Sequence, residues 1–474
     1  MIRAKQIHFK YPQANRGLVP TSLEISAGEL SLLTGPSGCG KSTLARCLIG
    51  LIPHLYRGKL SGEVWLNGYR TTDVPMWKLA EKAGMVFQNP ASQMLASSVE
   101  EEIIFGLENL GLDRAEIDQR LAAVLDQFDL ENLRFRSPNS LSGGEQQKLA
   151  LAAILARRPE VLILDEPLSM LDTTAAGELV AYLKNFVNTG KTVVAFEHRH
   201  EFFEEVLKLR LMSLGDKNRS QESLPDTDFL PDREKFELII EKLCVDLGGS
   251  PVLRDINLNI KSGEWVAVVG RNGVGKTTLL RALAGLQKFG GRIETISDDG
   301  ERPADFGMVF QNPDLQIFNA SVREEILYRT LNPNINLYDA VVKSLGLKIY
   351  EDTPPLLLSE GEKKRVGLAM VMMRQPLHGV LLDEPSLGLD SGHKEIFSRM
   401  MCKLANSGQV VIMTTHDLTL ASQAHRIVLL GKEGVIADDA TDKMLKNTAI
   451  WEQAGIRLPD WFMKEWRRRK TDAS

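Results

Sequence analysis

The amino-acid sequence predicts an α/β fold in which two copies of one domain follow each other along the chain. A repeat is the first observation: residues 27–51 align without gaps on residues 262–286, with 12 identical residues in 25 positions. The string GMVFQNP is the second, because it occurs at 84–90 and again at 307–313. Short, nearly unbroken apolar runs are the third, and they are typical of strands buried on both faces of a parallel sheet. Each copy is therefore expected to have a mostly parallel sheet at its core.

The predicted strands and helices surround a glycine-rich loop in each copy. The apolar runs lie at 30–33, 161–164 and 193–196 in the first copy and at 266–269, 380–382 and 410–413 in the second. After the first run of each copy, apolar residues recur at helical spacing, as Leu44, Cys47, Leu48 and Leu51 and as Leu279, Ala282, Leu283 and Leu286. The predicted order is therefore strand, glycine loop, helix.

A polar stretch predicts the boundary between the copies. Residues 215–232 are rich in Pro, Ser, Asp and Asn and lack the apolar residues needed to fold. We expect domain 1 at 1–214, a linker at 215–232 and domain 2 at 233–474. A chain of 474 residues exceeds what one hydrophobic core usually organises, which agrees with this division.

The composition argues against several classes of protein. Lys and Arg number 57 against 62 Asp and Glu, a net charge of -5, so nucleic acid is not expected as a partner. The four cysteines are scattered without metal-ligand spacing, which favours a reducing, cytoplasmic compartment. No apolar run approaches the ~18 residues of a membrane span, and the first residues lack a signal-peptide pattern. We therefore expect a soluble chain whose role at a membrane would depend on a partner.

Two glycine-rich loops predict phosphate binding. GPSGCGKST (35–43) and GRNGVGKTT (270–278) both match G-x-x-x-x-G-K-[ST], each between an apolar run and a helical pattern. Glycines let backbone N–H groups face phosphate oxygens at a helix N-terminus, the lysine neutralises the β- and γ-phosphates, and the next hydroxyl binds Mg²⁺. Recurrence in register argues against a chance glycine turn. The expected ATP-binding residues are Gly35, Ser37, Gly38, Gly40, Lys41, Ser42 and Thr43, and Gly270, Asn272, Gly273, Gly275, Lys276, Thr277 and Thr278.

Each copy also carries an acidic pair at the end of an apolar run. These pairs are Asp165 with Glu166 and Asp383 with Glu384. The carboxyl edge of an open α/β sheet is where ligands bind, so the aspartates are expected to hold Mg²⁺ and the glutamates to orient or deprotonate the attacking water. A solvated turn is the alternative, and the position after each phosphate loop argues against it.

LSGGE (141–145) and LSEGE (358–362) are weaker signals of a phosphate-binding helix end. Ser142 or Ser359 could simply be an N-cap. A capped helix N-terminus also binds anions, so both interpretations stay open, and Gly144 and Gly361 are included in the expected nucleotide site.

The order of these motifs in both halves resembles the nucleotide-binding domain of ABC ATPases. It runs from the phosphate loop through the QNP segment, LSGGE or LSEGE, the acidic strand end and LSMLD or SLGLD to a histidine. The resemblance implies two phosphate-loop NTPase domains, each a mostly parallel sheet core with an antiparallel β subdomain and a helical subdomain. It also implies an intramolecular pseudo-dimer with two shared ATP sites, in which the phosphate loop of one half meets the signature segment, LSGGE or LSEGE, of the other.

The family's residue roles carry over to matching positions. Gln88 and Gln311 resemble glutamines that sense Mg²⁺ and the γ-phosphate. They are therefore expected both as metal ligands and as catalytic residues. The other expected metal ligands are Ser42, Asp165, Thr277 and Asp383, and the other expected catalytic residues include Glu166 and Glu384. His198 and His416 each lie 32 positions after the glutamate and resemble the histidine that contacts the γ-phosphate. Asp172 and Asp390 resemble residues that cross between the halves. Tyr11 matches the aromatic that stacks on adenine, although an edge-strand tyrosine is the alternative.

Longer strings resemble one branch of this family, the ATPases of energy-coupling-factor (ECF) transporters. QNPASQ and QNPDLQ add Gln93 and Gln316, and IPHLYRGKLSGEV (52–64) and AGIRLP (454–459) complete the resemblance. The closest likeness is to fused two-domain forms linked to uptake of thiamine precursors or related vitamins. It implies two partners, an integral membrane coupling protein and a small substrate-binding membrane protein, and a peripheral place at the cytoplasmic face of the membrane.

Two alternatives and one further segment stay open at this point. The first alternative is a tandem ABC protein acting on ribosomes or nucleic acid. Such a protein typically carries a long charged arm or a cysteine-rich domain, whereas this sequence shows only a short polar linker. The second alternative is the fused ATPase of a sugar importer, which would not account for both QNPxxQ strings. Near the C-terminus, Trp461, Trp466 and the basic run 467–470 could touch a membrane or partner, but a solvated basic tail is favoured.

The two copies differ at three places that bear on the sites. Leu247 stands where an adenine-stacking aromatic is expected, and Glu360 replaces a glycine of the signature. EHR (197–199) in the first copy corresponds to THD (415–417) in the second, a difference that the sequence does not explain. Both copies keep Lys, Asp, Glu and His, so both are predicted to hydrolyse ATP, unequally.

Overall fold

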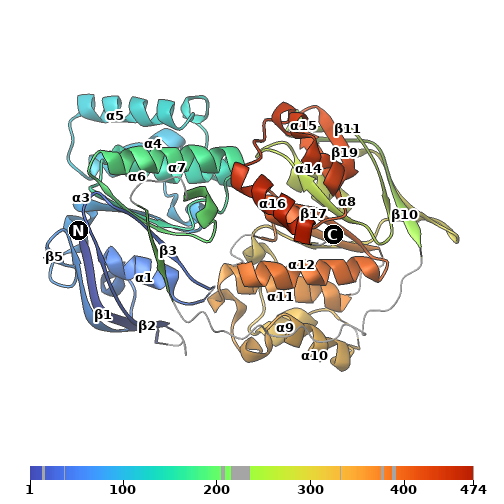
Figure 1. The fold of residues 1–474 in the computed structure, drawn as a ribbon, viewed down its shortest axis with the longest axis horizontal. Helices are drawn as coiled ribbons and strands as arrows, with labels where there is room; N and C mark the ends of the chain where they lie inside the picture. The colour runs from blue at the N-terminus through green and yellow to red at the C-terminus, as the bar shows by residue number, and fades with distance from the viewer. Residues whose placement is uncertain are drawn as a thin grey trace. The chain divides into compact units, whose positions relative to one another are not determined.

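The chain forms two compact units, Met1–Arg219 and Ser220–Ser474 (Figure 1). The computed structural model describes residues 1–12, 17–36, 38–203, 209–214, 235–330, 332–374, 378–386 and 391–472, without the side chains at 360, 391, 393 and 470–472. The predicted linker 215–232 lies outside the described residues, so the predicted domain bounds stay a prediction.

A parallel sheet lies at the centre of unit 1. Its strand order is β6-β7-β8-β3-β9, with β3 Leu30–Thr34, β6 Ala83–Val86, β7 Val161–Asp165, β8 Thr192–Phe196 and β9 Leu209–Ser213. Every neighbouring pair is parallel. The three predicted strands of this copy are confirmed as β3, β7 and β8, which are buried along most of their length because both faces of the sheet are covered.

An antiparallel sheet and one helix cover the first face of this central sheet. The antiparallel order is β2-β1-β4-β5, with β1 Ile2–Lys10, β2 Gly17–Ile25, β4 Lys59–Leu66 and β5 Tyr69–Arg70. Helix α1 (Lys41–Leu48) packs between the two sheets. Its buried Leu44, Cys47 and Leu48 share a core with Ile7 of β1 and Ile163 of β7, which is the packing that the helical spacing predicted.

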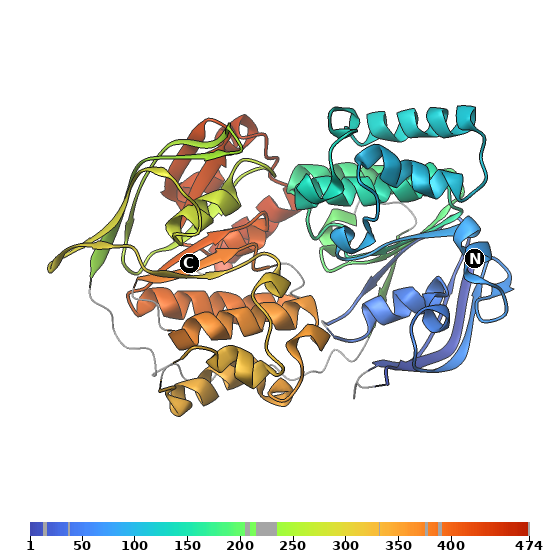
Figure 2. The same ribbon diagram turned by 180° about the vertical axis from the view of Figure 1, so that it is seen from behind.

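Helices cover the second face of the sheet in unit 1 (Figure 2). Residues Leu151 of α6 and Leu179 of α7 pack on Leu164 of β7, and α4 and α5 form a smaller core with α6. The helices are α2 Leu51–His54, α3 Met76–Lys82, α4 Val99–Glu108, α5 Arg114–Gln127, α6 Gly143–Ala156 and α7 Thr173–Asn188, with 3₁₀ turns η1 Pro90–Gln93, η2 Glu131–Leu133, η3 Pro138–Ser140 and η4 His200–Phe203.

Unit 2 repeats this plan with one extra antiparallel strand at the edge of its central sheet. The order is β15-β16-β17-β12-β18-β19, with β12 Trp265–Val269, β15 Phe306–Val309, β16 Gly379–Asp383, β17 Val410–Thr414, β18 Arg426–Gly431 and the antiparallel β19 Gly434–Ala440. The antiparallel sheet has the order β11-β10-β13-β14, with β10 Phe236–Leu247, β11 Ser250–Lys261, β13 Gly290–Ser297 and β14 Gly300–Pro303.

Helix α8 (Lys276–Leu283) of unit 2 packs between its two sheets, as α1 does in unit 1. Leu279 and Leu283 are buried in that core, as predicted. Leu286 was predicted to continue the buried face, and this is wrong. The helix ends at Leu283, Gly285 then adopts a left-handed φ of 69°, and the side chain of Leu286 is 57% exposed.

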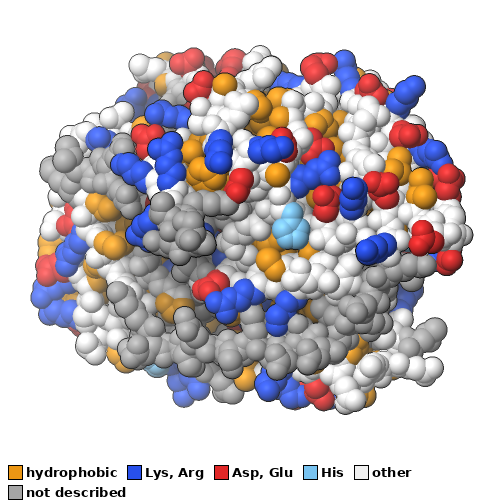
Figure 3. Space-filling view, turned by 45° about the vertical axis from the view of Figure 1, so that its right-hand side comes forward, with side chains coloured by type: hydrophobic (Ala, Val, Ile, Leu, Met, Phe, Trp, Pro, Cys, Tyr) orange, Lys and Arg blue, Asp and Glu red, His pale blue; other side chains and the backbone are white. Residues whose placement is uncertain are grey.

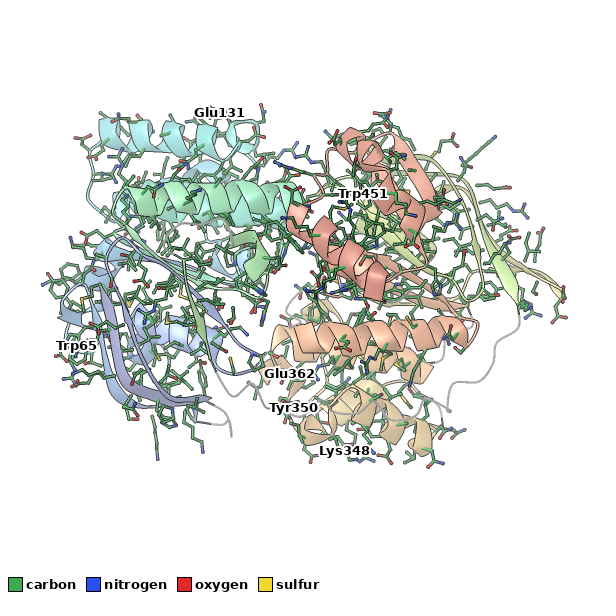
Figure 4. All side chains as sticks on the ribbon, viewed as in Figure 1. Trp65, Glu131, Lys348, Tyr350, Glu362 and Trp451 are labelled. Atoms are coloured by element: carbon green, nitrogen blue, oxygen red, sulfur yellow. The ribbon has the colours of Figure 1, made fainter. Side chains whose placement is uncertain are left out.

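The remaining helices of unit 2 pack on the other face of its sheet and on one another. Trp451 is fully buried there, and its indole N–H donates to the Met444 carbonyl at 2.9 Å (Figure 4). Trp461 and Trp466 are partly buried against the same core. The helices are α9 Val322–Leu327, α10 Ile335–Ser344, α11 Glu360–Arg374, α12 Ser391–Asn406, α13 Leu418–Ala421, α14 Thr441–Lys446, α15 Thr448–Gln453 and α16 Asp460–Asp472, with 3₁₀ turns η5 Pro313–Leu315, η6 Lys348–Tyr350 and η7 Pro355–Leu357.

None of the described helices is long and apolar enough to cross a lipid bilayer. On the face drawn in Figure 3, Lys and Arg side chains are interspersed with Asp and Glu side chains.

Candidate nucleotide sites

The described glycines of the two glycine-rich loops have matching conformations. Gly40 and Gly275 have φ of 97° and 99°, and each immediately precedes the helix that begins with the lysine. Gly38 and Gly273 are also left-handed, with φ of 76° and 80°. A side chain at the first position cannot fit, because a Cβ on Gly35 would lie 2.5 Å from the Leu214 carbonyl oxygen. These conformations require glycine, which is the physical reason for the pattern.

The loop lysines are buried and held by the loop's own carbonyls. Lys41 Nζ donates to the carbonyl oxygens of Gly35 at 2.9 Å and Pro36 at 3.2 Å. Lys276 Nζ donates to those of Gly270 at 2.8 Å and Arg271 at 3.1 Å. Each ammonium therefore lies inside the curl of its loop, where it can exchange carbonyl partners for phosphate oxygens.

The loop hydroxyls contact the aspartates at the ends of the acidic strands. The Thr277 hydroxyl donates to Asp383 Oδ1 at 3.0 Å, and Ser42 hydrogen-bonds to Asp165. Burial raises the pKa of both carboxyls, and these hydrogen bonds oppose the rise only in part. Asp165 Oδ1 is buried without a hydrogen-bond partner among the described residues. Each unit thus places a hydroxyl and a desolvated carboxylate together, which suits a hard cation.

Those donors are not a complete metal cage. Among the described residues no group of three or more His, Cys, Asp and Glu side chains could hold a metal ion. Mg²⁺ is usually bound through one or two carboxylates together with water and substrate phosphates, so the residues fit this ion only alongside a nucleotide.

The next residue of each strand end has an unusual backbone. Glu166 and Glu384 have φ of 49° and 47°, in the left-handed region that non-glycine residues rarely adopt. Such a conformation costs of order 1–3 kcal/mol and persists where the surroundings impose it, most often at functional sites. The backbone N–H of Glu166 donates to Phe196 and that of Glu384 donates to Thr414, so the neighbouring strand holds each turn in place.

The histidines predicted to contact the γ-phosphate, here called the switch histidines, lie beside these glutamates, with different contacts in the two units. In unit 1, His198 Nε2 is 3.6 Å from Glu166 Oε1, and Gln88 Nε2 donates to Glu166 Oε2 at 2.8 Å. In unit 2, His416 Nδ1 is 2.9 Å from Glu384 Oε2. Burial raises the pKa of Glu384, but the attraction of His416 and Lys276 outweighs this effect and leaves it lowered.

A second glutamine holds the segment that follows Gln88 or Gln311. Gln93 Oε1 accepts the backbone N–H of Phe87 at 2.8 Å, and Gln93 Nε2 donates to the Met85 carbonyl at 3.1 Å. Gln316 makes the same pair of bonds, with Phe310 N–H at 3.0 Å and the Met308 carbonyl at 2.9 Å. The side-chain amide therefore pairs with the end of β6 or β15 as a neighbouring strand would.

Both signature serines act as N-caps, which was one of the two interpretations. The Ser142 and Ser359 hydroxyls accept the backbone N–H of Glu145 and Glu362, each at 3.4 Å. In return a Glu362 carboxylate oxygen accepts the Ser359 N–H at 2.9 Å, near the start of α11 (Figure 4). The anion-binding interpretation remains a prediction for Ser142, Gly144, Ser359 and Gly361.

The other predicted nucleotide residues lie around these loops or outside the described residues. The Tyr11 hydroxyl is 3.4 Å from Thr43 Oγ1 and accepts Arg46 Nη1 at 3.2 Å, which places the ring beside the phosphate-loop helix. Leu247 ends β10 and is exposed. Asp172 caps α7 by accepting the Ala175 N–H at 2.9 Å. Ser37, Asp390 and the Glu360 side chain are not among the described parts of the chain.

Sequence reasoning missed other residues at these sites. Lys364 is buried, and its ammonium donates to the Glu384 carbonyl at 2.6 Å. Glu197 and Arg199 contact the segment between Glu166 and Asp172. Two charged residues flanking a histidine were visible as a signal, but their partners were not.

Fold and sites together define a chain with two phosphate-loop nucleotide-binding domains. The family described as ABC transporter matches residues 18–169 and 253–387, more than half of the chain. The chain belongs to this family and is an ABC transporter ATPase with tandem ATP-binding domains.

Several relatives match this chain over nearly its whole length. A putative ABC transporter ATP-binding protein of Methanosarcina acetivorans is 33% identical over 97% of this chain and 89% of its own length. A protein of Treponema denticola with the same description is 33% identical over 93% of this chain and 97% of its own. The putative HMP/thiamine import ATP-binding protein YkoD of Bacillus subtilis is 30% identical over 98% of this chain and 96% of its own.

A solved structure reproduces the tandem fold. The archaeal ribosome recycling factor aABCE1, in complex with the ribosomal stalk protein aP1, aligns with a TM-score of 0.61 over 94% of this chain and 92% of its own. Its sequence is 21% identical, so this likeness concerns the fold alone.

Proposed function

We propose that the chain is the ATP-hydrolysing, energy-coupling subunit of an ECF-type importer for a vitamin or related micronutrient. The observation that carries the proposal beyond the ABC family is a repeated apolar surface beside the glutamine segments. Leu95 and Phe318, two positions after Gln93 and Gln316, are 77% and 60% exposed. Large apolar side chains exposed at equivalent positions of two domains suit contact with a partner.

Phe318 has an aromatic neighbour directly after α9. It packs edge to face against Tyr328, with ring centroids 4.7 Å apart. Phe105 of α4, at the position in unit 1 that corresponds to Tyr328, is also exposed. The loop before each helix is held by a buried carboxylate, because Glu102 accepts the backbone N–H of Leu95 at 2.8 Å and Glu325 that of Phe318 at 2.8 Å. A firmly held loop with an exposed apolar side chain can transmit movement between the glutamine segment and a partner.

The implied partners are an integral membrane coupling protein and a small substrate-binding membrane protein. The chain would then lie at the cytoplasmic face of the membrane as a peripheral subunit, without nucleic acid as a partner. The relative named for HMP/thiamine import, similar over almost the full length of both chains, supports a vitamin precursor as the class of substrate.

ATP hydrolysis is proposed to use the same residue set in each unit, described here for unit 1. Lys41 would release its loop carbonyls and bind the β- and γ-phosphates. Ser42 and Asp165, with Gln88, would hold Mg²⁺, which neutralises phosphate charge when bound. Glu166 would accept a proton from the attacking water, and His198 would bind the γ-phosphate. The equivalent set in unit 2 contains Thr277, Gln311, Asp383, Glu384 and His416, with Lys276.

The two sites are proposed to be shared between the halves, as in the family arrangement. Tyr11 and the first phosphate loop would then meet the signature that contains Glu360. Leu247 and the second phosphate loop would meet the unmodified signature. One deviation would fall in each site, so both should hydrolyse ATP, with unequal affinity.

Two pairs of variants test this proposal. Glu166→Gln and Glu384→Gln should each lower ATP turnover and together abolish it, because each removes one proton acceptor. Complete loss of ATP turnover from Glu166→Gln with no effect of Glu384→Gln would contradict two working sites.

The membrane partner is tested separately. Leu95→Ser with Phe318→Ser should reduce the recovery of an integral membrane protein with the full chain from membranes. Leu286→Ser, which changes an equally large exposed leucine elsewhere, is the matched control and should not. Recovery of ribosomal RNA in place of a membrane protein would overturn the transport proposal.

A further inference from the structure

The loops that carry the two switch histidines are tied to different parts of their units. In unit 1 the histidine lies between Glu197 and Arg199, directly after β8. In unit 2 it lies between Thr415 and Asp417, directly after β17. Each histidine directly follows the same strand of the repeated central sheet, so the contacts of the flanking side chains can be compared between the two units.

Glu197 is a buried carboxylate satisfied by backbone N–H groups. It is 3% exposed, and its Oε1 accepts the N–H of His198 at 2.8 Å and of Arg199 at 3.1 Å. Its Oε2 accepts the N–H of Leu168 at 3.0 Å. One carboxylate therefore joins the histidine loop to the chain just beyond Glu166, with charge-assisted hydrogen bonds on both sides.

Arg199 completes the link from the other side. Its Nη1 donates to the carbonyl oxygen of Leu168 at 2.9 Å and to that of Leu171 at 3.2 Å. The guanidinium also lies over the ring of Phe202, 4.5 Å from the centroid, which helps to hold its direction. Both backbone polar groups of Leu168 are thus bound by the two side chains that flank His198.

The segment that these side chains grip connects Glu166 to Asp172. Leu168 and Leu171 are buried in the unit 1 core, so the segment is anchored by packing as well as by hydrogen bonds. Glu166 at its start has the left-handed backbone described above, and Asp172 at its end caps α7. A shift of the histidine loop must therefore move this segment or break the three hydrogen bonds that join the two.

The corresponding residues of unit 2 bind helices. Asp417 caps α13 by accepting the N–H groups of Thr419 at 3.0 Å and Leu420 at 3.2 Å. It also pairs with Lys394 of α12 at 2.6 Å. The Thr415 hydroxyl accepts the Asp417 N–H at 3.0 Å. An acid after the histidine therefore directs the loop of unit 2 toward α12 and α13.

We propose that Glu197 and Arg199 are positioning residues that couple His198 to the Glu166–Asp172 segment in unit 1, and that THD couples the unit 2 histidine to α12 and α13. The proposal rests on the hydrolytic roles proposed above for Glu166 and His198. It accounts for the difference between EHR and THD. It also predicts that replacing the residue after the histidine affects ATP hydrolysis at Glu166 differently from ATP hydrolysis at Glu384.

The test uses the full chain with Glu384→Gln, so that hydrolysis reports on Glu166. Arg199→Ala should lower kcat for ATP about tenfold or more and change KM less than about twofold, because the segment loses its geometry while the phosphate loop is untouched. Arg199→Lys should recover much of kcat, since an ammonium can donate to both carbonyls. Arg210→Ala is the matched control: Arg210 also donates to a backbone carbonyl in unit 1, that of Glu24 at 2.8 Å, and turnover should be unchanged.

A second variant keeps the test decisive if Arg199→Ala does not fold. Glu197→Gln preserves the shape of the side chain but turns an amide N–H toward a backbone N–H, and it should also lower kcat with little change in KM. An active Glu384→Gln chain in which both variants keep full kcat would overturn the positioning role alone. Parallel loss of kcat and ATP affinity, without rescue by lysine, would show a merely structural effect and overturn it as well. An inactive Glu384→Gln chain would overturn the role of Glu166 and this inference with it.

Discussion

Gln93→Glu is expected to destabilise unit 1 at neutral pH and to do so less as the pH falls. The natural amide accepts the Phe87 N–H and donates to the buried Met85 carbonyl. A carboxylate keeps the first hydrogen bond but places its other oxygen against the Met85 oxygen. Losing one hydrogen bond and leaving a buried acceptor unpaired costs about 1–3 kcal/mol, and the unshielded negative charge adds to it. For a unit of this size each kcal/mol lowers Tm by roughly 2–4 °C.

The pH dependence distinguishes this account from a general loss of packing. The carbonyl oxygen disfavours the charged form, so the pKa of the introduced carboxyl should be raised in the folded chain. A raised pKa means that stability is fully present below the ordinary pKa of a glutamate and is lost as the pH rises through the folded value. The protonated carboxyl can donate to Met85, which restores both hydrogen bonds. Gln93→Leu removes both at every pH and should show no such recovery.

Thermal unfolding between about pH 8 and pH 5 is the assay, with Gln119→Glu as the control because Gln119 is an exposed glutamine on α5 of the same unit. Gln316→Glu should reproduce the result in unit 2, since Gln316 makes the same two bonds. A Tm difference that is independent of pH, or no larger than that of Gln119→Glu, would refute the reasoning.

Three further outcomes follow from buried polar groups. Asp383→Asn should raise the free energy of unfolding without nucleotide by an amount on the order of 1 kcal/mol, because burial raises the pKa of Asp383 and the natural chain loses stability as the pH rises through that pKa. The resulting rise in Tm should be larger at about pH 8 than at about pH 5, and a lower Tm at pH 8 would contradict it. Gln147→Leu should stabilise unit 1 by about 1–3 kcal/mol in denaturant unfolding, because Gln147 is fully buried and neither amide atom has a hydrogen-bond partner among the described residues; equal or reduced stability would argue against this. Burial raises the pKa of Cys47 to about 12, so in a native thiol titration with a disulfide reagent the exposed Cys244 should react first and Cys47 only on unfolding, and early labelling of Cys47 would count against the packing.

Local chemistry explains which site features could be read from the chain alone. A phosphate loop needs left-handed glycines at set positions, as Gly40 and Gly275 show, so its requirements are written within nine consecutive residues. The buried strands must be apolar on both faces, which makes β7 and β16 visible as runs. The acidic residues directly after these runs could then be placed at the ligand-binding edge, because the carboxyl ends of parallel strands lie at one edge of the sheet.

Other features depended on contacts between distant parts of the chain. Gln93 and Gln316 belong to the QNPxxQ strings that indicate the family. Their hydrogen bonds to the backbone at the ends of β6 and β15 could not be inferred from spacing. Leu286 fits the helical pattern and yet is exposed, because α8 ends at Leu283, three residues before the pattern ends. The fate of that leucine depended on the turn at Gly285, whose left-handed φ redirects the chain.

The two halves therefore share what short motifs encode and differ in what packing selects. Repeat, fold class and the residues of each phosphate loop and strand end follow from the amino-acid order, because each depends on neighbours a few positions away. The partner of each charged side chain does not. Arg199 and Asp417 occupy the same position after a histidine, but the folded chain gives them different partners. The guanidinium of Arg199 donates to the carbonyl oxygens of Leu168 and Leu171. The carboxylate of Asp417 accepts backbone N–H groups of α13 and pairs with Lys394 of α12, because a cation binds hydrogen-bond acceptors and an anion binds donors.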